Sequence, residues 1–181
     1  TGNIRASNNY RILVVIKALK NIIKKNKNIY LNIAGFIEDK IHIINIINKL
    51  NIEKNINFIN EYSQINAPNI YREADAYITM TFQDNCPSAV LEAMSCGLPI
   101  LYSNSGGIPE LVDRDSGIGL HVKENWENIE IPRSAEIEES MLKIIDKRAE
   151  MSKAARSRAI DFFDIKDWIN KHNEVIEKLI N

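Results

Sequence analysis

The feature that most limits the fold is an alternation of short apolar runs with longer segments of helical periodicity. Within the first helical segment, 12–25, apolar residues recur every three or four positions. The further helical segments cover 40–50, 67–74, 87–96 and 109–112, and the strand-length runs cover 29–34, 56–59, 76–81, 99–103 and 119–122. Strands joined by helical crossovers are typical of a parallel sheet. We therefore predict an α/β fold, a Rossmann-like doubly wound parallel sheet with helices on both faces.

The 181 residues suffice for one domain with a substantial core but are few for two. Residues 123–134 are polar, contain Pro132 and form the only plausible joint. We predict one sheet domain over 1–134 and C-terminal helices over 135–181 that pack on the same domain. Phe162 and Trp168 are expected to anchor the terminal helix.

Charge and hydropathy argue against several classes of function. A net charge of −1 offers no positive excess for nucleic acid or an anionic membrane. The apolar runs are much shorter than the roughly 20 residues of a bilayer span, and no signal-peptide pattern is visible. We expect a cytoplasmic protein without a transmembrane segment or a nucleic-acid partner. Cys86 and Cys96 lack metal-ligand spacing and are expected to be reduced thiols.

Two loops follow neighbouring predicted strands, and ligands of doubly wound sheets bind beyond the carboxyl ends of the strands. The first loop delivers Asp84, and the second is Ser105-Gly106-Gly107. Paired glycines let a backbone approach a ligand closely, and exposed amides before a helix suit an anion such as phosphate. A diphosphate is therefore a reasonable occupant of this edge.

Glu92 lies in the apolar run Ala89-Val90-Leu91-Glu92-Ala93-Met94 and raises the question of its partner. At helical spacing it shares a face with Ser88 and Ser95. Burial without partners would cost several kcal/mol, whereas two adjacent sugar hydroxyls would satisfy the carboxylate. From this residue alone, a head group that reaches solvent at the helix edge is the favoured alternative.

The stretch from Asp84 to Glu110 resembles the donor-binding segment of glycosyltransferase family 4, a retaining family of the GT-B fold. Asp84 is followed after seven residues by Glu92-Ala93-Met94-Ser95-Cys96-Gly97-Leu98-Pro99, and then by Gly106-Gly107-Ile108-Pro109-Glu110. Weaker similarity covers Ile29 to Gly35, the element Tyr71-Arg72-Glu73-Ala74-Asp75-Ala76, the segment Asp113 to Val122, and the tail from Met151 to Trp168. The resemblance implies the C-terminal, nucleotide-sugar-binding half of such an enzyme, with the acceptor site on a separate N-terminal half.

The resemblance also implies roles for single residues. Glu92 matches the Glu that holds the ribose hydroxyls, and Asp84 matches the acidic residue that lies against the donor sugar. Asp84 is one methylene shorter than the Glu usual in the family. The positions whose amides face sugar and phosphate are occupied by Asn85, Cys86, Pro87 and Ser88. Pro87 has no amide to donate, so sugar specificity is expected to differ.

Cations near the N-terminus are the next implied feature. The family has an Arg and, five residues later, a Lys that neutralise the diphosphate. Arg5 stands at the Arg position and Tyr10 at the Lys position, with Arg11 next to it. Arg11 could replace the Lys, because its planar fork suits phosphate. A solvated Arg11 is an equal alternative.

Other charged groups are not assigned to the site. Asp113-Arg114-Asp115 is expected to be a solvated turn, and no metal site is expected from the scattered histidines. A basic helix face of solvated residues is expected from Arg148, Lys153, Arg156 and Arg158.

The sequence thus predicts the donor half of a retaining glycosyltransferase that uses a nucleotide diphosphate sugar, needs no cofactor or metal, and is inactive or weakly active alone. Its partner would be an N-terminal acceptor-binding domain, in cis or in trans. The alternative is a non-catalytic nucleotide-sugar-binding or partner-binding module, such as a subunit of a split transferase. A nucleotide-sugar epimerase or a phosphorylase of the same fold is a more distant alternative.

Overall fold

The computed structural model describes residues 4–125 and 127–180. The chain begins with the 3₁₀ helix η1 (Ala6–Asn8) and α1 (Tyr10–Lys25). Strands and helices then alternate: β1 (Leu31–Ala34), α2 (Lys40–Leu50), the 3₁₀ helix η2 (Glu53–Asn55), β2 (Ile56–Ile59), α3 (Ala67–Arg72), β3 (Tyr77–Thr79), α4 (Ser88–Ser95), β4 (Ile100–Asn104), α5 (Ile108–Leu111) and β5 (Gly117–His121). Three helices follow, α6 (Ser134–Asp146), α7 (Arg148–Phe163) and α8 (Ile165–Ile180).

All strand pairs are parallel, as the alternation of elements predicts. They form two ladders, β1–β2 and β3–β4–β5. The α/β class and the parallel, helix-covered arrangement are confirmed, whereas the expected single sheet is divided between β1 and β3.

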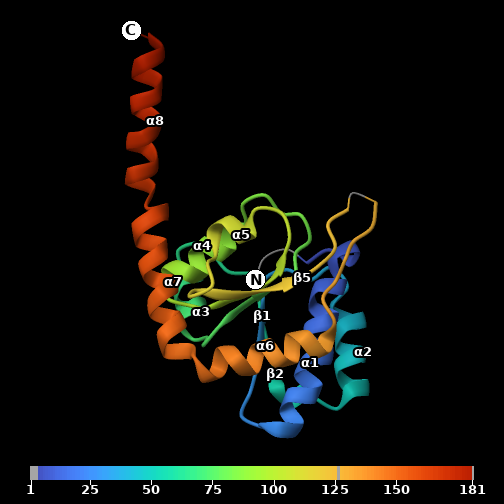
Figure 1. The fold of residues 1–181 in the computed structure, drawn as a ribbon. Helices are drawn as coiled ribbons and strands as arrows, with labels where there is room; N and C mark the ends of the chain where they lie inside the picture. Colours follow the sequence, from blue (N-terminus) through green and yellow to red (C-terminus); the bar gives the residue numbers. More distant parts are fainter. Residues whose placement is uncertain (1–3, 126, 181) are drawn as a thin grey trace.

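Helices cover both faces of the β3–β5 ladder, because alternate residues of β4 point to opposite sides. Ile100 and Tyr102 pack with α3, α4, α5 and α7. Leu101 packs on the other side with residues of α1 and α6. Figure 1 shows α4 and α5 above the strands and α1 and α6 below them. The sheet is therefore buried on both faces, as parallel sheets usually are.

The last helix, α8, does not follow the expectation that the whole C-terminal segment packs on the domain. Helix α6 packs against α1, and α7 packs against α4. Helix α8 has no buried residue and extends away from the body (Figure 1). Phe162 and Trp168 are 64% and 55% exposed, so the expectation that they anchor the terminal helix is wrong. The Trp168 ring stacks on His172 of its own helix instead.

Candidate functional site

Two loops meet backbone to backbone at the carboxyl edge of the β3–β5 ladder. The Gly107 N–H donates to the carbonyl oxygen of Asp84 at 2.9 Å, and the Gln83 N–H donates to Oγ of the buried Ser105 at 3.1 Å. A Cβ added to Gly106 would clash with the Asp84 backbone, and one added to Gly107 would clash with the carbonyl of Asn85. Contact between the loops therefore requires both glycines, and Gly106 also has a positive φ of 61°.

These contacts narrow the phosphate-binding role predicted for the second loop. The Ser105 N–H donates to the carbonyl oxygen of Ser103 at 2.8 Å, and the Gly107 N–H is used by Asp84. Two of the three amides in Ser105-Gly106-Gly107 are thus engaged within the protein. Within this loop, the predicted hydrogen bond to an anion is therefore left to the amide of Gly106. Any further donors must come from other segments at the same edge.

The N-terminus of α4 provides further donors at the same edge. Pro87 is the N-cap residue, and no side chain caps the helix. The helix begins at Ser88, one residue later than expected. Asn85, Cys86 and Ser88 are exposed, and Asp84 and Pro87 are half-buried. Amides in an uncapped first helical turn favour an anion, so the loop from Asp84 to Ser88 could receive one from solvent.

Of the two N-terminal arginines, Arg11 is the one that the structure holds against the end of β3. Its Nη1 donates to Oγ1 of Thr81 at 2.9 Å, and that hydroxyl also lies 2.9 Å from Oγ1 of Thr79. Arg11 is half-buried, which contradicts the alternative of a solvated side chain, while Arg5 is exposed at the start of η1. Tyr10, at the expected Lys position, is the first residue of α1.

Glu92 has a protein partner that the sequence did not reveal. The hydroxyl of Tyr71, on α3, donates to Oε2 of Glu92 at 3.0 Å. Tyr71 is buried among the apolar residues of α4, and Glu92 is half-buried. The bond explains how a carboxylate can lie in an apolar run. Tyr71 belongs to the element 71–76 that resembles the family, but nothing in that pattern indicates its contact with Glu92.

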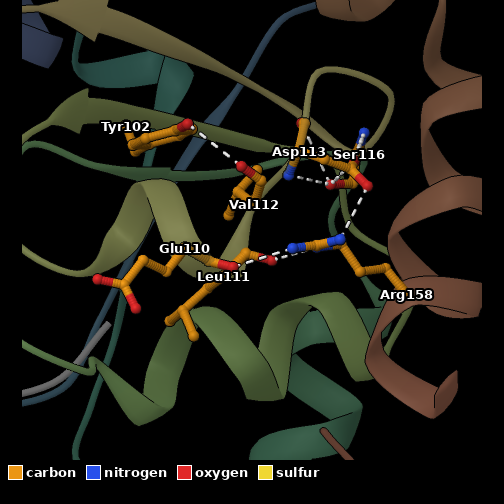
Figure 2. Close-up of polar contacts among 7 residues, drawn as sticks. All are labelled: Tyr102, Glu110, Leu111, Val112, Asp113, Ser116 and Arg158. Carbon is orange, nitrogen blue, oxygen red and sulfur yellow. Dashed lines mark hydrogen bonds and ion pairs between the residues drawn. The ribbon is translucent and has the colours of Figure 1, made fainter. Parts of the chain in front are cut away.

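A second cluster of polar contacts ties α7 to the segment around α5 (Figure 2). The guanidinium of Arg158 donates to the carbonyl oxygens of Leu111 at 2.6 Å and Glu110 at 2.9 Å, and to the carboxylate of Asp113 at 3.1 Å. Asp113 in turn accepts a 2.6 Å hydrogen bond from the Ser116 hydroxyl. We call this set the Arg158 cluster. It lies at the amino edge of β5, which begins at Gly117, and so faces away from the two loops.

This cluster shifts two pKa values. Burial raises the pKa of Asp113, but hydrogen bonds from Ser116 and the charge of Arg158 outweigh it, so that pKa lies below its ordinary value. Burial raises the pKa of Tyr102, and the negative charge of Asp113 adds to the rise while Arg158 opposes it. Both shifts belong to a structural cluster and not to the candidate site.

Of the basic face expected on α7, Arg148, Lys153 and Arg156 are exposed, as predicted, whereas Arg158 is half-buried. Besides Arg158, Arg148 donates to Asp75 at 2.7 Å and Arg156 donates to the carbonyl oxygen of Ser95. Asp113 is likewise held, so the 113–115 segment is not merely a solvated turn. These residues fasten α7 to the domain.

Residues 4–125 and 127–180 lack two kinds of structural feature. They contain no group of three or more His, Cys, Asp or Glu side chains arranged to hold a metal ion. They also contain no helix of the length and apolarity that crossing a bilayer requires.

A basic residue, an acidic loop and a glycine bend thus share the carboxyl edge of the strands, which is where open α/β sheets bind their ligands. Residues 4–158 match the model of the family "Glycosyl transferases group 1". The chain belongs to this family.

Curated relatives are longer than this chain. Protein CapJ of Staphylococcus aureus is 30% identical over 103 residues, which are 56% of this chain and 26% of CapJ. An uncharacterized glycosyltransferase of Haemophilus influenzae is 28% identical over 116 residues, 64% of this chain and 32% of the relative. The chain thus spans about a third or less of these two proteins.

Solved structures confirm the fold. Anabaena Alr3699/HepE, solved in complex with UDP and glucose, superposes with a TM-score of 0.79 at 19% identity, over 98% of this chain and 47% of that one. The C-terminal domain of the group 1 glycosyl transferase LpcC from Francisella tularensis gives a TM-score of 0.74 at 18% identity, over 91% and 84% of the two chains. The chain therefore has the fold of GT-B glycosyltransferase C-terminal domains.

Proposed function

We propose that this chain is the donor-binding half of a retaining glycosyltransferase. It would bind a nucleotide diphosphate sugar, and the sugar would pass to an acceptor held by a separate N-terminal domain in cis or in trans. The observation that carries the proposal is the position of Arg11 against Thr81, at the edge where the Asp84 loop meets Gly106 and Gly107.

Each group at this edge has a distinct proposed role. Arg11 and Arg5 would neutralise the diphosphate with charge-assisted hydrogen bonds. The amide of Gly106 and the first turn of α4 would donate to the phosphate oxygens as the leaving group gains charge. Asp84 would orient the sugar and stabilise the positive charge that develops on it, without forming a covalent bond. The proposal includes no metal ion or other cofactor, and it places the reaction in the cytoplasm.

The Tyr71 hydrogen bond is compatible with the ribose-binding role of Glu92. An ionised carboxylate has about four acceptor positions on its two oxygens, and Tyr71 uses one of them on Oε2. The same bond fixes the carboxylate in one orientation. Glu92 can therefore accept from two ribose hydroxyls without first losing its protein partner.

Calorimetric titration with UDP, GDP, ADP and UDP-glucose tests the proposal. We expect at least one nucleotide to bind, and Arg11→Gln to weaken that binding about tenfold because it removes a charged donor to phosphate. Arg114→Gln is the matched control, because Arg114 is exposed at the amino edge of β5. A folded protein that binds none of the ligands, or equal losses in both variants, would contradict the proposal.

A non-catalytic module is the second candidate, and three substitutions favour it. Asp84 is shorter than the usual Glu, Pro87 has no amide, and Tyr10 replaces a Lys. The two candidates differ in turnover. Slow hydrolysis of a bound nucleotide sugar that Asp84→Asn abolishes, with nucleotide affinity preserved, supports the transferase. The module is supported if the chain binds a nucleotide sugar but does not turn it over when an acceptor half is added. That acceptor half must first be shown to be active with its own donor half.

A further inference from the structure

Gln83, directly before Asp84, has a backbone conformation that its residue type rarely adopts. Its φ of 55° lies in the left-handed region, and Asn51 is the only other non-glycine residue with a positive φ among those that the structure describes. Asn51 is the C-cap of α2, where a left-handed residue is common, and asparagine tolerates that region. Gln83 follows a strand instead. Its backbone is therefore strained, and such strain persists only where surrounding contacts enforce it.

Contacts on both sides of the Gln83 Cα enforce this conformation. The Gln83 N–H donates to Oγ of Ser105, which is fully buried, at 3.1 Å. The carbonyl oxygen of the next residue, Asp84, accepts from the Gly107 N–H at 2.9 Å. A Cβ on Gly106 would clash with the same carbonyl, so the Asp84 backbone lies directly against the glycine bend. The loop after β4 thus holds the backbone of Gln83 and Asp84.

The side chain of Gln83 adds a contact with a third loop. Its Nε2 donates to the carbonyl oxygen of Asn125 at 2.6 Å, although the two residues are 42 positions apart in the chain. Asn125 lies in the loop after β5, and β4 separates β5 from β3 in the ladder. Gln83 therefore connects the loops of two strands that are not paired with each other.

The Asn125 end of this contact is held in a turn. Its Oδ1 accepts from the N–H of Asn128 at 2.6 Å and from the N–H of Glu127 at 3.1 Å. Its Nδ2 lies 3.4 Å from Oε1 of Glu130. An asparagine side chain that accepts from backbone N–H groups two and three residues later stabilises a turn. The Asn125 carbonyl is therefore a fixed acceptor for Gln83.

We propose that Gln83 is a positioning residue for Asp84. Its side chain fastens the Asp84 loop to the loop after β5, and its left-handed backbone sets the direction in which the chain carries the Asp84 carboxylate. In the proposed function, on which this role rests, Asp84 orients the donor sugar. Without the bond to Asn125, Gln83 would relax toward the right-handed or extended region and turn Asp84 away from the sugar. Strained conformations of this kind concentrate at functional sites.

Three variants test the role of Gln83. Gln83→Met removes the hydrogen bond, because methionine has a similar length and no N–H donor. Gln83→Gly removes the bond and also the strain, since glycine adopts the left-handed region freely. Asn51→Gly is the matched control, because it makes the same backbone change before β2, at the amino edge. Calorimetric titration with UDP and with UDP-glucose is combined with hydrogen exchange across residues 84–88.

The two Gln83 variants should lose affinity for the sugar and not for the nucleotide. We expect UDP-glucose to bind about tenfold more weakly, UDP affinity to change less than twofold, and exchange across 84–88 to become at least fivefold faster. The two ligands should separate because Asp84 is proposed to face the sugar, whereas Arg11 and Glu92 are proposed to face the nucleotide. Asn51→Gly should match the wild type in all three measurements.

The wild type and Gln83→Met together separate this role from the proposed function. A wild type that binds no nucleotide contradicts the proposed function, and with it the role of Asp84. A wild type that binds both ligands, beside a Gln83→Met variant with unchanged affinities and unchanged exchange, overturns the role of Gln83 alone. Equal losses of UDP and UDP-glucose in Gln83→Met would also overturn it, because Gln83 would then stabilise the fold and not direct Asp84.

Discussion

Helices α7 and α8 are both 16 residues long and adjacent in the chain, yet they relate to the domain in opposite ways. Helix α7 has little apolar periodicity but buries Ala155 and Ala159 against α4, and Met151 against residues of α1 and α6. Helix α8 has a regular apolar stripe, all of it exposed: Ile165, Trp168, Ile169, Val175, Ile176, Leu179 and Ile180.

The difference shows what apolar periodicity does and does not specify. It identifies the face of α8 that would pack, but a partner must exist for that face to be buried. On α7, small residues allow close approach to α4, and arginines supply the remaining attachment through bonds to Asp75, Ser95, Glu110 and Leu111. Helix α7 is therefore held by polar contacts as well as by small buried residues, whereas no residue of α8 is buried.

Removing the Arg158 cluster should weaken the attachment of α7 most. Arg158→Met removes the donor to Glu110, Leu111 and Asp113, and 21% of the Arg158 side chain is exposed. We expect a loss of about 2–3 kcal/mol in the free energy of unfolding, because carbonyl oxygens at the end of α5 lose a charged donor. Urea denaturation measures it.

Arg158→Lys is the matched control for charge. A lysine keeps the charge near Asp113 but cannot bridge several acceptors with a planar fork. The free energy of unfolding of Arg158→Lys should lie between those of the wild type and Arg158→Met. Stability equal to the wild type in both variants would show that small buried residues alone hold α7.

Acid should weaken the same attachment by a smaller amount. The folded pKa of Asp113 is below its ordinary value. Its stabilisation is therefore present above the unfolded pKa of about 3.9 and is lost as the pH falls through the folded pKa. Since 43% of the side chain is exposed, solvent screening keeps the effect below about 1 kcal/mol.

The Asp113 contribution is isolated by comparison with Asp113→Asn. Urea denaturation of both proteins from pH 7 to pH 3 should show the wild type more stable at neutral pH and the two converging in acid. A stability difference that is constant over this range would assign the role of Asp113 to hydrogen bonding alone.

Most of the fold was predictable because its strands are continuous apolar runs bounded by turns. The five strands and five body helices occur within a few residues of their predicted positions. The division into two ladders was not predictable, since strand pairing depends on neighbours that local patterns do not specify. The exposure of α8 was not predictable either, because its amphipathic pattern is also typical of a helix that packs on a domain.

The candidate site was predictable only as a set of positions. Spacing placed Asp84 and the glycine pair on adjoining loops, and the structure brings them into contact. Spacing could not show that Gly107 uses its amide within the protein, that Tyr71 bonds Glu92, or that Arg11 reaches Thr81. Those contacts join residues between 21 and 70 positions apart in the chain, where one sequence contains no local signal.

The smallest predicted effect concerns the apolar stripe of α8. Ile176 is 51% exposed, so Ile176→Ser should change the free energy of unfolding by less than about 0.5 kcal/mol. Met151→Ser on α7 is the contrasting control, because Met151 is 6% exposed and its loss from the core should cost at least about 2 kcal/mol. Urea denaturation compares both variants with the wild type. A loss for Ile176→Ser as large as that for Met151→Ser would mean that the stripe is buried in solution. Both helices would then have a buried face, and they would differ only in the surface against which that face packs.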